Sequence, residues 1–283
     1  MACSGCFSGT VNSDTPTGTV ATIHGLPTYV ARPKGPAQGI VVYIPDLFGW
    51  ELPNARLLAD KYASKSGFTV YLPDFMNGHA ASLSTLHAME SLLAPASLVT
   101  TLVRKPIWFA QIIRAAVPFF IMNRQSVIQP RIKTFHAALR ADSATNFMKI
   151  GSAGFCWGGF HTVHLCQDDQ PLIDVGFVAH PSGLRIPRDL EAVKVPLSVA
   201  VGDVDMMMRV DHVREAKSVL EKNGDNRNEV IIYPGAKHGF AVRANPDVPG
   251  QMESAFAAEE QAREWFEKWL GRSSECSRHS TQT

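Results

Sequence analysis

The chain has 283 residues, 45% of them hydrophobic, and it carries 27 basic and 26 acidic side chains. A chain of this length and apolar content buries a large core, and α/β proteins of this size commonly form one domain. The near balance of charge provides none of the counterion release on which nucleic-acid affinity depends. We therefore expect neither a nucleic acid nor a membrane as a partner.

The five cysteines are odd in number and widely spaced, and the first nine residues lack the basic start and apolar run of a secretory signal. This pattern is typical of a reducing compartment and predicts a cytoplasmic protein. Cys3 and Cys6 form a C-x-x-C pair, but no second pair of ligands follows at the spacing of a zinc site. No metal and no other cofactor is predicted.

The first 25 residues are rich in Ser, Thr and Gly and predict an N-terminal segment that is partly flexible. The run GIVVYIPD (39–46) is short, apolar and β-branched, as in a strand buried on both faces. A helix is predicted over 53–66, ending before Gly67, and FTVYLPD (68–74) is the second strand.

The second half of the chain continues the alternation of strands and helices. Helices are predicted over 125–141, 157–166, 210–223 and 251–270, and strands over 148–155, 173–180, 196–203 and 229–235. This order predicts an α/β fold, a mostly parallel sheet with helices on both faces. We expect one domain over 26–271, followed by a flexible polar tail over 272–283.

The segment 78–124 is too long for a simple connection and too apolar for a linker. Arg104, Lys105 and Arg114 interrupt its apolar residues, and Pro106 and Pro118 disfavour one long helix, so no uncharged stretch reaches the ~20 residues that cross a bilayer. We predict a helical insertion that caps the functional site. A helical elaboration with only structural duties is the alternative.

The sharpest functional signal is GFCWGG, residues 154–159, between a predicted strand and a predicted helix. A strained strand-to-helix turn with small neighbours presents a nucleophile, here Cys156 in place of the usual serine. The positive end of the helix dipole stabilises a thiolate there. The alternatives are a buried structural cysteine and a redox sensor, for which Cys166 is the nearest thiol in sequence.

A nucleophile elbow is followed in chain order by an acid and then a histidine. His238 in YPGAKHGF follows the last predicted strand and is the candidate base, with His180 as its main rival. Asp205 in GDVD is the candidate acid that orients the imidazole, and Asp203 is the alternative.

An acyl-transfer site also needs two backbone N–H donors for the oxyanion. One belongs to the residue after the nucleophile, Trp157, and the other to the loop PDLFG after an early strand, at Leu47. Phe48 in the same loop is a candidate substrate contact or a packing residue.

Together, GFCWGG, PDLFG, GDVD and YPGAKHGF resemble the dienelactone hydrolase family, especially its fungal branch, over residues 26–270. The resemblance implies an α/β-hydrolase fold with Cys156, Asp205 and His238 as the catalytic triad. It also implies that Asp46 stands where bacterial members have a glutamate that contacts the resting thiol. Family members bind a substrate carboxylate with arginine, for which Arg124 and Arg243 are candidates here.

These features predict a cysteine hydrolase that opens a lactone, enol ester or cyclic anhydride through a thioester intermediate. One alternative is a biosynthetic hydrolase or decarboxylase that acts on an aromatic polyketide-type intermediate with the same site. Another is a noncatalytic binding protein on a hydrolase scaffold. The expected partner is a small molecule, plausibly anionic, and the oligomeric state stays open, a homodimer included.

Overall fold

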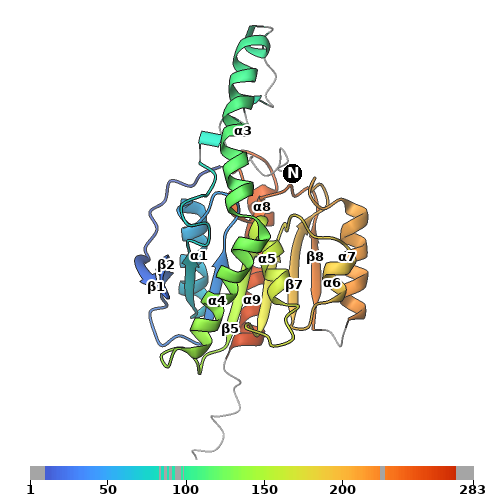
Figure 1. Ribbon diagram of the computed structural model, residues 1–283. Coiled ribbons are helices and arrows are strands. Elements are labelled where there is room, and N and C mark those ends of the chain that lie inside the picture. The colour runs from blue at the N-terminus through green and yellow to red at the C-terminus, as the bar shows by residue number, and fades with distance from the viewer. Residues whose placement is uncertain are drawn as a thin grey trace, which may run out of the picture.

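The computed structural model describes residues 10–82, 84–85, 88, 91–92, 97, 99–223 and 227–271. Within these residues the centre of the protein is an eight-stranded sheet of order β1-β2-β4-β3-β5-β6-β7-β8 (Figure 1). The strands are β1 (Thr19–Ile23), β2 (Leu26–Ala31), β3 (Ile40–Ile44), β4 (Thr69–Pro73), β5 (Ile150–Phe155), β6 (Val175–Ala179), β7 (Leu197–Gly202) and β8 (Glu229–Tyr233).

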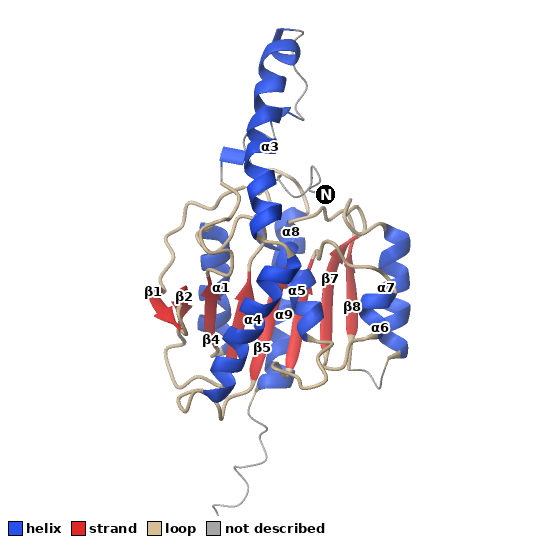
Figure 2. Cartoon of the chain, in the orientation of Figure 1, coloured by secondary structure: helices blue, strands red, loops and turns tan. Residues whose placement is uncertain are grey.

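Strands β3 to β8 run parallel, whereas β1 and β2 are antiparallel to their neighbours. The six parallel strands therefore end at one edge of the sheet, where the loops carrying the predicted site residues emerge. The predicted α/β-hydrolase architecture, a mostly parallel sheet with helices on both faces, is confirmed (Figure 2).

Strand β1 lies inside the segment 1–25 that the sequence predicts to be partly flexible. Its residues pair with β2 from Thr19 opposite Val30 to Ile23 opposite Leu26. The sheet therefore includes residues before position 26, where the sequence analysis places the start of the domain. Cys3, Cys6 and the predicted tail 272–283 lie outside the described residues.

Helices cover both faces of the sheet. One face carries α1 (Pro53–Ser66), α8 (Phe240–Arg243) and α9 (Gln251–Leu270); the other carries α4 (Gln125–Ala141), α5 (Trp157–Leu165), α6 (Arg188–Glu191) and α7 (Val210–Lys222). The bounds of α1, α4 and α9 agree with those predicted from sequence. Helix α1 begins with proline in its first turn and ends at Gly67, whose φ of 71° is the left-handed conformation that glycine adopts readily.

The core consists of two apolar clusters, one on each face of the sheet. On one face Phe266 of α9 packs edge-on against Tyr62 of α1 and Phe68, and Trp265 donates its indole N–H to the carbonyl of Gly176 at 2.9 Å. This bond fastens α9 to β6. The sheet is thereby buried on both sides, which keeps the edge with the predicted site residues rigid.

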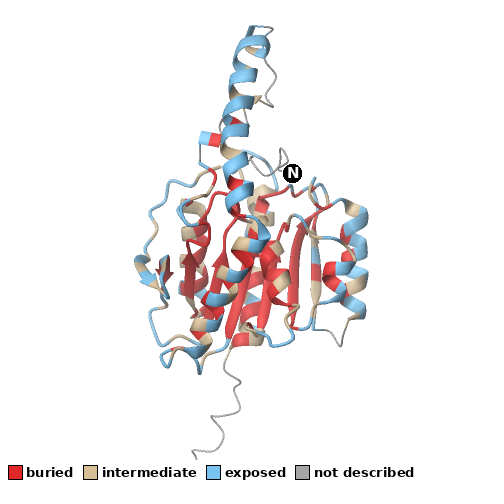
Figure 3. Cartoon of the chain, in the orientation of Figure 1, coloured by how far each residue is buried: buried red, intermediate tan, exposed pale blue. Residues whose placement is uncertain are grey.

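The predicted insertion 78–124 contains a π-helical turn, η2 (Thr100–Arg104), and helix α3 (Lys105–Met122). Helix α3 projects away from the body, and most of its surface is exposed (Figure 3). Only its C-terminal end reaches the edge of the sheet that carries the predicted site residues, where Phe119 is buried. Within the described residues, one helical stretch, Thr100–Met122, is long enough and apolar enough to span a membrane, judged by length and composition alone.

Candidate active site

Cys156 stands at the sharp turn between β5 and α5. Its φ of 53° and ψ of −113° lie outside the regions that L-residues usually occupy, and it caps the N-terminus of α5. Its backbone N–H donates to Ala179 at 3.2 Å, and its carbonyl accepts from Ser182 at 3.1 Å. These bonds hold the strained residue in place, as expected of a position where strain serves function.

The glycines beside Cys156 are required by close contacts. A Cβ on Gly158 would collide with the carbonyl oxygen of Ile44, and one on Gly154 would collide with the hydroxyl of Thr162. Strand, turn and helix therefore approach more closely at this point than any side chain permits. The spacing GFCWGG thus follows from packing as well as from chemistry.

His238 lies on the turn after β8, where Asp205 accepts a hydrogen bond from its Nδ1 at 2.9 Å. Both side chains are fully buried. Because a carboxylate can only accept, the proton stands on Nδ1 and Nε2 carries the lone pair. A second bond, from the N–H of Met207 to Asp205 at 2.8 Å, fixes the carboxylate. This is the geometry of an acid that orients a general base.

The two rivals of this pair occupy other positions. Asp203 accepts the N–H of Gly235 at 2.7 Å, so its carboxylate stabilises the turn after β8. The His180 ring is buried, neither of its nitrogens has a hydrogen-bond partner in the described part of the chain, and the ring packs edge-on against His238 with 5.1 Å between ring centroids. Burial, with smaller effects from His238 and Arg243, holds the pKa of His180 well below its ordinary value. His180 is therefore neutral.

Asp46 and Arg243 form an ion pair in which both side chains are fully buried. Asp46 also accepts the N–H of Phe48 at 3.0 Å, and the Arg243 guanidinium lies 5.0 Å from the centre of the Phe48 ring. The sequence predicts Asp46 as a possible thiol contact and Arg243 as a candidate for binding a substrate carboxylate. In the structure the two neutralise each other, because a buried charge requires a partner.

The Cys156 sulfur has a different neighbour, the hydroxyl of Ser182 at 3.8 Å. Sequence reasoning missed Ser182, although it follows β6 by three residues and so stands at the same edge as the other loops. A hydroxyl at this distance can donate to a thiolate and hold it before substrate arrives.

A cavity of about 240 Å³ opens beside Cys156. Leu47 and Trp157 both line it, so the two predicted oxyanion donors border the same space as the thiol. Its wall is mainly apolar and includes Met207 from the loop that carries Asp205. The other lining residues are Phe119, Phe120, Asn123, Arg124, Gln125, Phe160, His161, Ser182 and Gly183.

Three polar side chains of this cavity can contact a substrate. Arg124, which the sequence predicts as a candidate for binding a substrate carboxylate, is exposed and donates to the carbonyl of Ile121 at 2.7 Å, which leaves other guanidinium donors for an anion. Asn123 was not predicted; it is buried, and its Oδ1 has no partner among the described residues. Burial lowers the pKa of His161 to about 3, with a smaller effect of His164, so that ring is a neutral hydrogen-bonding group.

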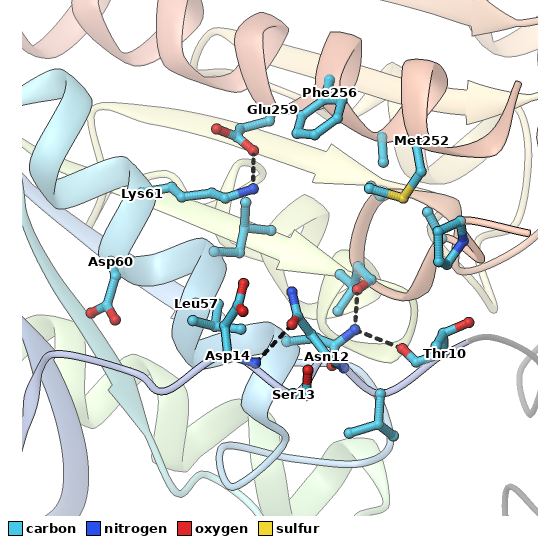
Figure 4. A pocket seen from close by; sticks show the side chains of 18 of the residues that line it. Thr10, Asn12, Ser13, Asp14, Leu57, Asp60, Lys61, Met252, Phe256 and Glu259 are labelled. Carbon is cyan, nitrogen blue, oxygen red and sulfur yellow. Dashed lines mark hydrogen bonds and ion pairs between the residues drawn. The ribbon is translucent and has the colours of Figure 1, made fainter.

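A second and larger cavity, of about 580 Å³, lies elsewhere, beneath the chain segment 10–17 and between α1 and α9 (Figure 4). Its charged side chains include Lys61 and Glu259, which form an ion pair at 2.9 Å. No predicted catalytic residue lines it. Across the described residues, no three His, Cys, Asp or Glu side chains are placed to hold a metal ion.

Comparison with known proteins agrees with this geometry. The sequence profile of the dienelactone hydrolase family matches residues 26–273. The chain is 25% identical to the hydrolase pyvD of Aspergillus violaceofuscus, over 94% of this chain and 96% of that protein. It is 27% identical to the hydrolase tropI of Talaromyces stipitatus, over 94% and 95%. A putative dienelactone hydrolase structure from Klebsiella pneumoniae superposes with a TM-score of 0.62 at 17% identity, covering 89% of this chain and 98% of that one.

Proposed function

Since the chain belongs to the dienelactone hydrolase family and is a hydrolase of ester or lactone bonds, we propose that it opens them through a thioester on Cys156. The observation that carries the proposal is the strained backbone of Cys156 at the start of α5, beside an aromatic cavity. The Asp205–His238 pair supports it, because it supplies an oriented base at the same edge of the sheet.

The reaction has two halves. His238 removes the thiol proton of Cys156, the resulting thiolate attacks the substrate carbonyl, and the N–H groups of Leu47 and Trp157 stabilise the oxyanion. The adduct collapses to a thioester as the C–O bond breaks, and the leaving oxygen takes a proton from the imidazolium of His238. His238 then removes a proton from water, which attacks the thioester, and the acid product leaves as the thiol is restored.

The cavity supports a flat, aromatic or conjugated substrate. Phe119, Phe120, Trp157 and Phe160 provide aromatic faces and edges, while Arg124 provides cationic donors at the mouth. A thiolate departs easily from adducts with poor leaving groups, so enol lactones, enol esters and cyclic anhydrides are the preferred substrates. The Asp46–Arg243 pair stays structural in this proposal, and Arg124 is the anion-binding residue.

The same aromatic wall favours a second candidate, a biosynthetic hydrolase or decarboxylase that acts on an aromatic polyketide-type intermediate. Both candidates begin with the same attack by Cys156, and they differ in the steps after ring opening. Product analysis by mass spectrometry separates them, because loss of carbon dioxide changes the product mass whereas hydrolysis alone adds water. The reduced thiol that either reaction needs agrees with a cytoplasmic location.

The test is turnover of enol lactones, cyclic anhydrides and p-nitrophenyl esters by wild type and Cys156→Ala. We expect the variant to lose at least about 10³-fold in kcat on every substrate that wild type hydrolyses. Cys166→Ala is the matched control: it removes the other buried thiol, whose high pKa is caused first by burial. Near-wild-type activity in Cys156→Ala would exclude the mechanism.

A second experiment tests the acid. Asp205→Asn should reduce kcat by about 10³- to 10⁴-fold, because an amide can hold the imidazole in the wrong tautomer. Asp203→Asn changes the neighbouring carboxylate, which bonds the turn at Gly235, and should cost less than tenfold, about 1 kcal/mol. Equal losses in the two variants would contradict the assignment of Asp205.

The remaining alternative is a binding protein without catalysis. Iodoacetamide alkylation at neutral pH distinguishes it, because a thiolate reacts faster than a free cysteine, whereas a protonated buried thiol reacts more slowly. Fast labelling of Cys156, with Cys166 unlabelled, supports the hydrolase. Slow labelling together with ligand binding would favour the binding protein.

A further inference from the structure

Helix α3 and the turn before it expose an apolar surface that has no cover among the described residues. Figure 1 shows α3 projecting beyond the sheet and its covering helices. The large apolar side chains left exposed there are Val99, Leu102, Val103, Ile107, Phe109, Ile113, Val117, Phe120, Ile121 and Met122. Monomeric soluble proteins rarely expose so continuous an apolar surface, so a surface of this kind marks a binding site.

The stretch Thr100–Met122 is not a core helix. Only 11% of the most apolar 18-residue part of this stretch is buried in the protein. The buried stripe is narrow and includes Ile112 and Phe119. The exposed apolar side chains, among them Ile113, Val117 and Phe120, lie on a broad face away from this stripe. This face is wider than the seam of a helix packed on a single partner helix.

The charge of this region is wholly positive. Residues 91–141 contain no Asp and no Glu, whereas they contain seven Lys and Arg. Arg104 and Arg114 are exposed on the same helical stretch as the apolar side chains. The net charge of +1 for the whole chain conceals this separation, because acidic residues elsewhere balance it. The expectation of no membrane partner rests on that average.

We propose that α3 docks the protein on an anionic phospholipid surface. Apolar side chains enter the boundary between headgroups and acyl chains, and Arg104, Lys105 and Arg114 meet lipid phosphates. Arg114 lies in the middle of the helix and Pro118 near its end. A cation at mid-helix is costly at the bilayer centre, so α3 lies at the interface and does not span the membrane.

A second copy of the chain fits this surface less well. A symmetric dimer brings the same patch of each subunit together, so the cations of one α3 would face those of the other. No carboxylate within residues 91–141 could compensate them. Lipid phosphates provide the opposite charge that a second α3 lacks.

Docking on lipid would place the catalytic cavity beside the bilayer. The base of α3 contributes Phe119 and Phe120 to the cavity wall, and Arg124 follows directly. An apolar substrate dissolved in lipid could then enter along the helix without crossing water. This consequence rests on the proposed function, whereas the binding of α3 to lipid does not.

The test is cosedimentation of the full chain with vesicles of phosphatidylcholine alone or with 30% phosphatidylserine, at about 0.1 M and 0.5 M salt. We expect at least about tenfold stronger binding to the anionic vesicles, and most of that gain should disappear at high salt. Brominated acyl chains should quench part of the tryptophan fluorescence, and Trp108→Phe should remove most of that quenching, which separates Trp108 from the other four tryptophans and places α3 at the interface.

Two double variants locate the contact. Ile107→Gln with Phe109→Gln removes apolar contact, and Arg104→Glu with Arg114→Glu reverses charge; each should weaken binding at least about tenfold. The matched control is Val20→Gln with Phe147→Gln, which changes two equally exposed apolar side chains away from α3 and should bind as wild type does. Hydrolysis of a water-soluble ester should be unchanged in all three.

The proposal is overturned if the wild-type protein does not bind anionic vesicles, or if the α3 variants bind these vesicles as strongly as wild type does. A concentration-dependent dimer that Ile107→Gln with Phe109→Gln abolishes would assign the surface to a second copy and also overturn it. Lipid binding by a protein that hydrolyses nothing would instead refute the proposed function and leave the docking intact.

Discussion

Helices α3 and α4 follow one another in the chain, yet they lie in different surroundings. Helix α4 buries Ile128, Ile132, Phe135 and Leu139, which recur every three or four residues on the face toward the sheet. Helix α3 is the more apolar of the two, yet only Ile112 and Phe119 are buried. The spacing of apolar side chains, more than their number, therefore decides whether a helix packs on its own domain.

The largest expected difference is in the free energy of unfolding, when one isoleucine of each helix is changed to alanine. Ile128→Ala removes a fully buried side chain of α4 and should lower the free energy of unfolding by about 2 to 5 kcal/mol. Ile107→Ala removes one that is 53% exposed on α3 and should change it by less than about 0.5 kcal/mol. Urea denaturation measures both. Equal losses would mean that α3 is packed against a partner in solution, and the comparison would break.

A somewhat smaller effect concerns pH. Burial lowers the pKa of His136 in α4 to about 4. Between its ordinary pKa of about 6.5 and this value the unfolded chain binds a proton that the folded chain refuses, so stability falls as pH decreases, by about 3 kcal/mol in total. His136→Leu should make the fall in stability between pH 7 and 4.5 less steep.

The control for this experiment is His212→Leu, which changes an exposed histidine of α7. Its pH dependence should match that of wild type. The buried His161 and His180 keep their contributions in either variant, so some acid sensitivity remains. An unchanged slope in His136→Leu would contradict the assignment.

The smallest effect compares the two ends of α3. Phe119 lines the cavity and packs edge-on against Trp157 with 6.1 Å between ring centroids. Phe119→Ala should reduce kcat/KM about tenfold, because the lost aromatic contact is worth about 1.4 kcal/mol. Phe109→Ala, at the exposed end, should leave kcat/KM on a soluble ester unchanged. If only Phe109→Ala reduced kcat/KM, the C-terminal end of α3 would not be the end that serves catalysis, and the proposed division between the two ends of the helix would be wrong.

Local sequence patterns predicted three helices of the domain and the turn that carries Cys156. The limits of α1 follow from Pro53 and Gly67, those of α4 and α9 from 3.6-residue periodicity, and the turn at Cys156 from its glycines. These features depend on neighbours in sequence. Strands β1 and β2 were missed, because neither Thr19–Ile23 nor Leu26–Ala31 shows a regular alternation of apolar and polar residues, and their pairing with each other supplies the signal that the sequence lacks.

Contacts between distant residues could not be predicted. Asp46 and Arg243 are 197 residues apart, and no spacing rule shows that one neutralises the other. Ser182 stands near Cys156 only because β5 and β6 are adjacent strands. The exposure of α3 could not be predicted either, because an apolar segment has the same composition whether it packs against protein or against lipid. The roles of Cys156, Asp205 and His238 stay predictions until the variants are measured.

The Asp46–Arg243 pair also affects when the PDLFG loop can fold during synthesis of the protein. Chains leave the ribosome N-terminus first, so Asp46 emerges 197 residues before Arg243. Until Arg243 has emerged, the aspartate that holds the PDLFG loop lacks its cation and favours exposure to water. The loop therefore settles in a nascent chain only after the segment that carries α8 has been made.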